Sequence, residues 1–129
     1  MKVSAREADA FIRKPHSNVV AVLVYGPDGG LVRERGRALV RSVLGDSDDP
    51  FRFLELDSGK VCDDPARIID ESASMSLTGD RHVVLVRQAD EGLVKAFEPV
   101  LDLDRSEAFF VVEAGDLGPR SGLRKAFEG

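Results

Sequence analysis

Four short runs of β-branched and other apolar residues recur along the chain, and stretches with a helical pattern separate them. They are residues 19–25 (VVAVLVY), 51–56 (FRFLEL), 82–86 (HVVLV) and 107–112 (EAFFVV). Strands that alternate with helices at this spacing form βαβ units, in which right-handed crossovers join parallel strands. The sequence therefore predicts an α/β fold of three layers with a parallel sheet in the middle. The partial alternation in 51–56 indicates a strand nearer the edge of the sheet.

Helical segments are predicted between and around these runs, at residues 5–14, 31–43, 65–74, 91–98 and 121–128. The apolar residues of the second segment share one helical face and are predicted to pack on the sheet; they are Leu31, Ala38, Leu39 and Val43. Asp64 before Pro65 is typical of a helix start, because aspartate caps well and proline is tolerated at the first helical position. Pro99 is expected to kink or end the helix before it.

Composition limits the class of protein. With 129 residues, of which 43% are hydrophobic and 32% charged, the chain fits one globular domain spanning residues 1–129. No apolar run approaches the roughly 18 to 20 residues of a membrane-spanning helix. Cys62 is the only cysteine, so no internal disulfide can form, and we expect a cytoplasmic protein without a membrane partner. The net charge of −5 argues against a domain held to DNA mainly by phosphate neutralisation.

The turn after the first predicted strand, Gly26-Pro27-Asp28-Gly29-Gly30, occupies the position of a phosphate-binding loop. The pattern that grips a nucleotide is G-x-x-x-x-G-K-[ST]. Counted from Gly26, the second glycine is replaced by Leu31, the lysine by Val32 and the Mg²⁺-binding hydroxyl by Arg33. The loop is therefore degenerate, and we expect no bound nucleotide or other cofactor.

The sequence offers only weak candidates for catalytic or metal-binding residues elsewhere in the chain. The third strand runs into Arg87 and Gln88, where a metal-binding acid pair would stand in an NTPase. Glu113 follows the fourth strand as a lone carboxylate, and a solvated or locally hydrogen-bonded acid is the favoured interpretation. His16 and His82 have no neighbouring ligands at metal-binding spacing. The sequence thus predicts neither a catalytic residue nor a metal site.

Two further segments could contact partners. Arg33, Arg37 and Arg41 repeat every four residues on one helical face, which favours a solvated surface over a binding site for a phosphate backbone. Met75 and Leu77 stand at a predicted helix end before a glycine. Taken by themselves, such apolar residues more often close a core than anchor a partner.

Together, several stretches resemble the N-terminal domain of the bacterial DNA polymerase III delta subunit, a clamp-loader subunit. The likeness rests on residues 22–35 (VLVYGPDGGLVRER), 75–81 (MSLTGDR) with the apolar strand that follows, 109–112 (FFVV) and 121–125 (SGLRK). It implies the fold of P-loop NTPases of the AAA+ type with a degenerate phosphate loop. Since that family is usually over twice this length and the helix 121–128 is cut short, the chain is expected to be the first domain of a longer protein.

The resemblance also implies a function. In that family the domain does not hydrolyse ATP, and a hydrophobic tip on it opens the ring-shaped sliding clamp, the beta subunit of the polymerase. The clamp-binding residues are then expected to be Met75, Ser76, Leu77 and Thr78, with Leu77 as a wedge and Thr78 at a position that is usually aromatic. Because of the resemblance, Leu77 is expected to contact the clamp rather than to close the hydrophobic core.

Partners and alternatives follow from the same likeness. It implies the sliding clamp as partner, other clamp-loader subunits through domains that this chain lacks, and DNA at most indirectly. The domain would be non-catalytic by itself within the DNA-directed DNA polymerase III holoenzyme, a nucleotidyltransferase. Two alternatives stay open, namely a nucleotide-dependent enzyme with a non-standard loop and Glu113 as its acid, and a protein-interaction domain unrelated to replication.

Overall fold

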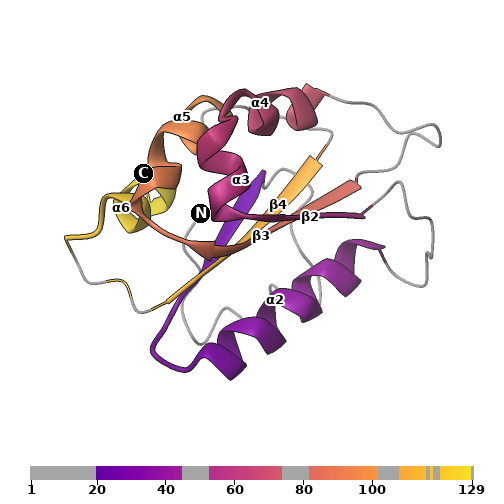
Figure 1. Cartoon of the computed structure of the whole chain (residues 1–129). Coiled ribbons are helices and arrows are strands. Elements are labelled where there is room, and N and C mark those ends of the chain that lie inside the picture. Colours follow the sequence, from indigo (N-terminus) through magenta and orange to yellow (C-terminus); the bar gives the residue numbers. More distant parts are fainter. Residues whose placement is uncertain are drawn as a thin grey trace.

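The computed structural model describes residues 20–44, 53–73, 82–101, 108–115, 117 and 120–128 (Figure 1). Its strands are β1 (Ala21–Val24), β2 (Phe53–Asp57), β3 (His82–Ala89) and β4 (Ala108–Ala114). The helices are α2 (Gly29–Leu44), α3 (Ser58–Asp63), α4 (Ala66–Ala73), α5 (Val94–Leu101) and α6 (Gly122–Glu128), and a 3₁₀ turn, η2 (Glu91–Leu93), precedes α5.

The strands form one sheet in the order β1-β4-β3-β2, and every neighbouring pair is parallel. The predicted parallel α/β fold is therefore confirmed. β2 lies at an edge, as its partial alternation indicated, and only one of its residues, Leu56, is buried. β3 and β4 are central and almost fully buried, which explains their continuous apolar sequences.

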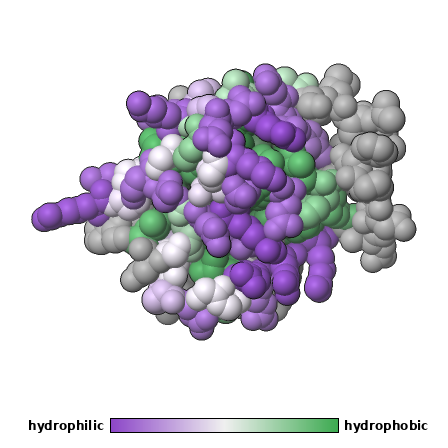
Figure 2. Space-filling model, viewed as in Figure 1, coloured by the Kyte–Doolittle hydropathy of each residue, from purple (hydrophilic) through white to green (hydrophobic). Residues whose placement is uncertain are grey.

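Helices cover both faces of the sheet, which confirms the three layers (Figure 1). Among the described elements, α2 packs on one face, and α3, α4, α5 and α6 gather on the other. The larger core cluster lies under these four helices and contains Phe97, Phe110 and Phe127, whereas the smaller one joins α2 to the sheet through Leu39 and Phe109. Polar side chains cover much of the surface seen in Figure 2, with apolar atoms visible between them.

The buried face of α2 differs from the predicted one. Leu39 is buried as expected, but Leu31 is 41% exposed, and the other inward residues are Val32 and Gly36. The physical reason is that α2 begins at Gly29 rather than after the glycine turn, since Asp28 caps it. The cap places Val32, rather than Leu31, over the sheet.

The helix expected at 65–74 is present as α4, but one helix was not predicted and another extends beyond its predicted end. A short helix, α3, precedes the expected one, with Asp57 as N-cap accepting from the backbone N–H of Lys60 at 2.9 Å, and Asp64 is the C-cap of α3. Pro99 does not end α5, which continues to Leu101, because the burial of Ala96, Phe97 and Val100 offsets the one backbone hydrogen bond that proline cannot make. The helix predicted at 121–128 is confirmed as α6.

Some predictions lie outside the described residues: the helix at 5–14, His16, and Met75, Ser76, Leu77 and Thr78. No helix within the described ranges has the length and apolarity needed to cross a lipid bilayer.

Candidate functional site

The glycine turn between β1 and α2 lies at the carboxyl edge of the parallel strands, where ligands bind in folds of this kind. Gly26 has a φ of +158°, which residues with a side chain rarely adopt, and its N–H donates to the carbonyl of Gly115 at 3.1 Å. This bond ties the end of β1 to the residue that follows β4. The turn is thus built into the sheet edge.

The first turn of α2 is capped from within the chain. Oδ1 of Asp28 accepts from the backbone N–H of Leu31 at 3.2 Å, and the Asp28 carbonyl accepts from Val32 N–H at 3.1 Å. In a phosphate-binding loop these N–H groups would face the anion. Here the Leu31 N–H donates to the Asp28 carboxylate and the Val32 N–H to the Asp28 carbonyl, so both are satisfied, and the carboxylate repels a second negative charge.

The side chains at the lysine and hydroxyl positions of the phosphate-loop motif also do not suit nucleotide binding. Val32, at the lysine position, is buried. Its Cγ2 packs against the turn, 3.9 Å from where a Cβ on Gly26 would stand. Arg33, at the hydroxyl position, is exposed. The structure therefore places an apolar contact and an exposed cation at the positions where an NTPase has its lysine and its Mg²⁺ ligand.

Charged side chains from β2, β3 and β4 meet at the same edge of the sheet. Nε of Arg87 lies 2.9 Å from Oε1 of Glu55 and 4.0 Å from Oε1 of Glu113. Neither approach has the alignment of a hydrogen bond, so both contacts are ion pairs. Arg87 thus stands between two carboxylates, where an NTPase would hold acids on β3.

Glu113 is 6% exposed, so the expectation of a solvated or hydrogen-bonded acid was wrong. Its Oε2 has no hydrogen-bond partner among the described residues and faces Gly36 of α2. Burial raises the pKa of Glu113, and the charge of Glu55 adds to this, whereas Arg87, Arg33 and Arg37 oppose it. Sequence alone did not indicate this burial; the signal in retrospect is Gly36, whose missing side chain leaves room for the carboxylate.

This raised pKa predicts how stability varies with pH. The folded protein keeps the Glu113 proton to higher pH than the unfolded chain, whose carboxyl titrates near its ordinary value of 4.5. Stability linked to this proton is therefore complete below that value and is lost as pH rises through the raised pKa. We expect urea unfolding to show wild type losing stability relative to Glu113→Gln over the range from pH 4.5 upward. A difference that stays constant across this range contradicts the prediction.

The contact between Gly36 and Glu113 predicts a second effect. A Cβ at position 36 would overlap Oε2 of Glu113 and lie 2.9 Å from its Cδ. We expect Gly36→Ala to destabilise the fold by about 1–3 kcal/mol, although alanine favours helices, because the overlap must be relieved. Gly29→Ala is the matched control, since no atom lies within 4 Å of its Cβ position. Adding Glu113→Ala to Gly36→Ala should recover stability; a loss equal to the sum of the single effects contradicts the overlap.

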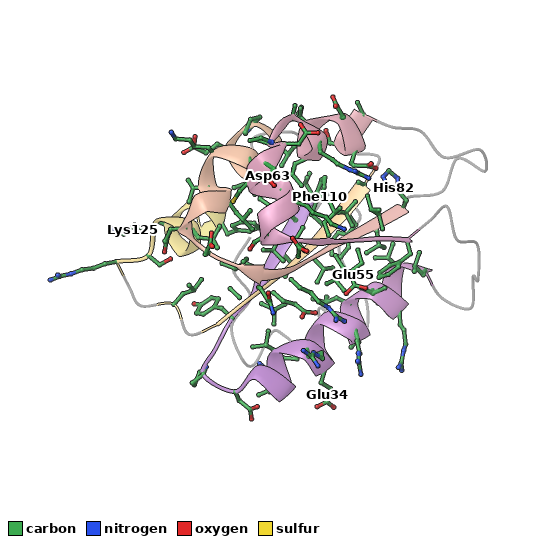
Figure 3. The ribbon with its side chains drawn as sticks, in the orientation of Figure 1. Glu34, Glu55, Asp63, His82, Phe110 and Lys125 are labelled. Atoms are coloured by element: carbon green, nitrogen blue, oxygen red, sulfur yellow. The ribbon has the colours of Figure 1, made fainter. Side chains whose placement is uncertain are left out.

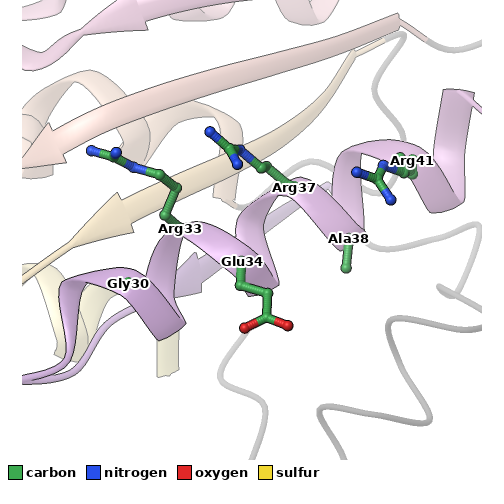
Figure 4. A pocket seen from close by; sticks show the side chains of 6 residues that line it. All are labelled: Gly30, Arg33, Glu34, Arg37, Ala38 and Arg41. Carbon is green, nitrogen blue, oxygen red and sulfur yellow. The ribbon is translucent and has the colours of Figure 1, made fainter.

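The arginine row of α2 lies beside this cluster. Arg33, Arg37 and Arg41 are exposed and line a groove of about 340 Å³ together with Gly30, Glu34 and Ala38. Figure 4 shows the three arginines along one side of the helix, with Glu34 and Ala38 pointing away from them. No ion pair joins the row to another of the described side chains. The row is thus a solvated cationic surface, as the helical pattern indicated.

Metal and cofactor chemistry receives no support from the described part of the chain. No group of three or more His, Cys, Asp or Glu residues there could hold a metal ion. Cys62 is exposed. Glu91 accepts hydrogen bonds from the hydroxyl of Ser121 and from Leu123 N–H, so it caps α6, and these contacts lower its pKa.

The strand order, the parallel pairing and the glycine turn leading into α2 define the class of protein: a parallel α/β domain with helices on both faces of the sheet. Within that class the chain has the fold of the clamp-loader proteins. It superimposes on the Bacillus subtilis DNA clamp loader delta protein with a TM-score of 0.69 and 20% sequence identity, covering 97% of this chain and 40% of that one. A DNA polymerase III gamma subunit-related protein from Thermotoga maritima matches with a TM-score of 0.61 and 22% identity, covering 82% of this chain and 37% of that one.

The chain therefore spans about two-fifths of the length of these solved structures. No protein-family model matches it, and no curated protein matches it in sequence.

Proposed function

We propose that this chain is a non-catalytic clamp-loader domain that binds the DNA sliding clamp and helps to open it during replication. The observation that carries the proposal is the structural likeness to a clamp loader delta protein over 97% of this chain. The Met75-Ser76-Leu77 motif, at the position of that family's clamp-binding tip, supports it from the sequence. In this proposal Met75, Ser76, Leu77 and Thr78 contact the clamp.

The phosphate-loop geometry supports the non-catalytic part of the proposal. The N–H groups at the start of α2 are turned to Asp28, and Val32 is buried where a lysine would reach the phosphates. Arg87 replaces an acid beside the metal position, and its neighbour Glu113 is enclosed against Gly36. A nucleotide would have to displace the aspartate cap without gaining a lysine contact or a Mg²⁺ ligand. In this scheme hydrolysis belongs to other subunits, and the domain is a rigid support for the clamp-binding residues.

Two titrations of the purified chain test the proposal. With the sliding clamp of its own organism, surface plasmon resonance should show saturable binding. With labelled ATP and Mg²⁺, fluorescence anisotropy should show no saturation up to millimolar concentration. Saturable ATP binding without clamp binding would favour a nucleotide-dependent enzyme instead, and failure of both would favour an interaction domain unrelated to replication.

A further inference from the structure

The arginine row of α2 concentrates positive charge on one helix of an acidic chain. Arg33, Arg37 and Arg41 are exposed, and no ion pair joins them to another of the described side chains. Because four residues separate each from the next, they follow one another at intervals of about 6 Å along the helix axis. The helix contains four arginines and one glutamate, whereas the whole chain has a net charge of −5. The row is therefore a regular line of cations that no described carboxylate pairs with.

The groove beside this row restricts what can bind there. Its described lining consists of the three arginines with Gly30, Glu34 and Ala38. The arginine side chains lie along one side of the helix, and Glu34 points away from them (Figure 4). Apart from the methyl group of Ala38, this lining has no apolar side chain, and Leu31, which is exposed on the same helix, is not part of it. Recognition in the groove therefore depends on charge.

The lack of apolar and aromatic lining separates one kind of polyanion from the others. Protein interfaces are held at their centre by buried aromatic or aliphatic anchors, and single-stranded nucleic acids stack their bases on aromatic side chains. The described lining of the groove offers neither. A duplex keeps its bases inside and presents phosphates, at one negative charge per roughly 1.7 Å of its axis in DNA. Arginine binds phosphate through two parallel hydrogen bonds, so a duplex backbone suits this row best.

We propose that the α2 groove binds the backbone of duplex DNA, with Arg33, Arg37 and Arg41 on phosphates of one strand. The choice of a duplex backbone rests on the groove, and the choice of DNA over RNA rests on the proposed function. Such a contact does not depend on base sequence, because phosphates carry no sequence information. It is weak and salt-sensitive, because three contacts act against a net charge of −5 and against Glu34 in the same groove. It adds a direct contact with DNA to the clamp contact proposed above.

The salt dependence of binding to a short fluorescein-labelled DNA duplex tests the row. Each arginine that neutralises a phosphate adds about 0.9 to the slope of log Kd against log salt concentration. We expect Arg33→Gln/Arg37→Gln/Arg41→Gln to weaken binding at least about tenfold at low salt and to lower this slope by about 2.7. Glu34→Gln should tighten binding, because it removes the carboxylate from the groove. Fluorescence anisotropy measures both effects, and a triple variant that binds like wild type overturns the inference.

The matched control removes three positive charges from the opposite face of the sheet. Arg67 on α4, Lys95 on α5 and Lys125 on α6 are exposed, and Figure 3 shows Lys125 well apart from α2. Their triple glutamine variant has the same net charge as the α2 variant but should weaken binding less than about threefold, because salt screens distant charges. Equal losses in the two variants overturn the inference, since binding then follows net charge alone. Circular dichroism checks that both variants are folded, as expected for glutamine at exposed helical positions.

Unlabelled competitors identify the occupant. Duplex DNA should displace the labelled duplex at lower concentration than a single strand, an RNA duplex of the same length or polyglutamate. Better competition by any of these three overturns the proposal, and polyglutamate in particular would indicate an acidic protein partner. Wild-type chain that does not bind duplex DNA even at low salt overturns it as well. Clamp binding by the same preparation is a separate measurement, so a chain that binds the duplex but not the clamp contradicts the proposed function and leaves the contact of the arginine row with a duplex in place.

Discussion

Leu77→Asp should weaken binding to the sliding clamp by at least about 100-fold while the chain stays folded. Under the proposed function, Leu77 enters an apolar pocket on the clamp, and burying a leucine yields about 1.5–3 kcal/mol. Aspartate loses that gain and must also bring a charge out of water without a partner, which adds a larger penalty. Equilibrium binding by surface plasmon resonance, at clamp concentrations well above the wild-type Kd, measures the loss.

Leu31→Asp is the matched control, because Leu31 is the exposed large hydrophobic residue among the described positions and lies on α2. An acid in the first turn of a helix is favourable, so this substitution should leave both folding and clamp affinity unchanged. Leu77→Ala should fall between wild type and Leu77→Asp. Clamp affinity that is equal for wild type and Leu77→Asp would remove Leu77 from the binding surface, whatever the fold.

Phe97→Ala should destabilise the fold by about 3–5 kcal/mol, a large part of the stability of a small domain. Phe97 on α5 is fully buried. Its ring lies edge-on to Phe110 of β4 with centroids 5.7 Å apart, and 5.6 Å from the ring of Phe127 on α6. One side chain therefore connects two helices and the central strand, and its removal leaves a cavity at their junction. Urea unfolding monitored by circular dichroism measures the change.

Phe53→Ala provides the aromatic control. Phe53 begins the edge strand β2, is only partly buried and packs against the smaller cluster on the α2 face. Its truncation should cost clearly less than that of Phe97, since less apolar surface is uncovered and water can fill the space. Equal losses for the two variants would contradict the central role of Phe97 at the junction of α5, α6 and β4.

The strands were the part of the fold that the sequence predicted best. A parallel strand covered on both faces needs a continuous apolar run, and such runs placed β1, β3 and β4 within a few residues of their bounds. Helix ends were harder to predict, because several neighbouring residues can supply the capping hydrogen bond and the sequence does not show which one does. Asp57 and Asp64 both resemble N-caps, and the structure uses Asp57 to begin α3 and Asp64 to end it.

The candidate site could be predicted only in part. A missing lysine and a missing hydroxyl can be read directly from Val32 and Arg33, since motif chemistry depends on side-chain type. The internal capping by Asp28 was not foreseen, and it shifted the buried face of α2 from Leu31 to Val32. The resemblance suggested Leu77 as a wedge, and this stays a prediction because residues 75–78 lie outside the described part of the chain.

By itself, the sequence determined the class of fold and the absence of phosphate-gripping residues, because periodicity and residue type are local properties. Only the tertiary structure decided which charges meet. It brought Glu113 from β4 under Gly36 of α2, and it joined His82 to Glu71 across the residues that separate them. Such contacts depend on how helices pack against the sheet, and no local pattern in the chain specifies that packing.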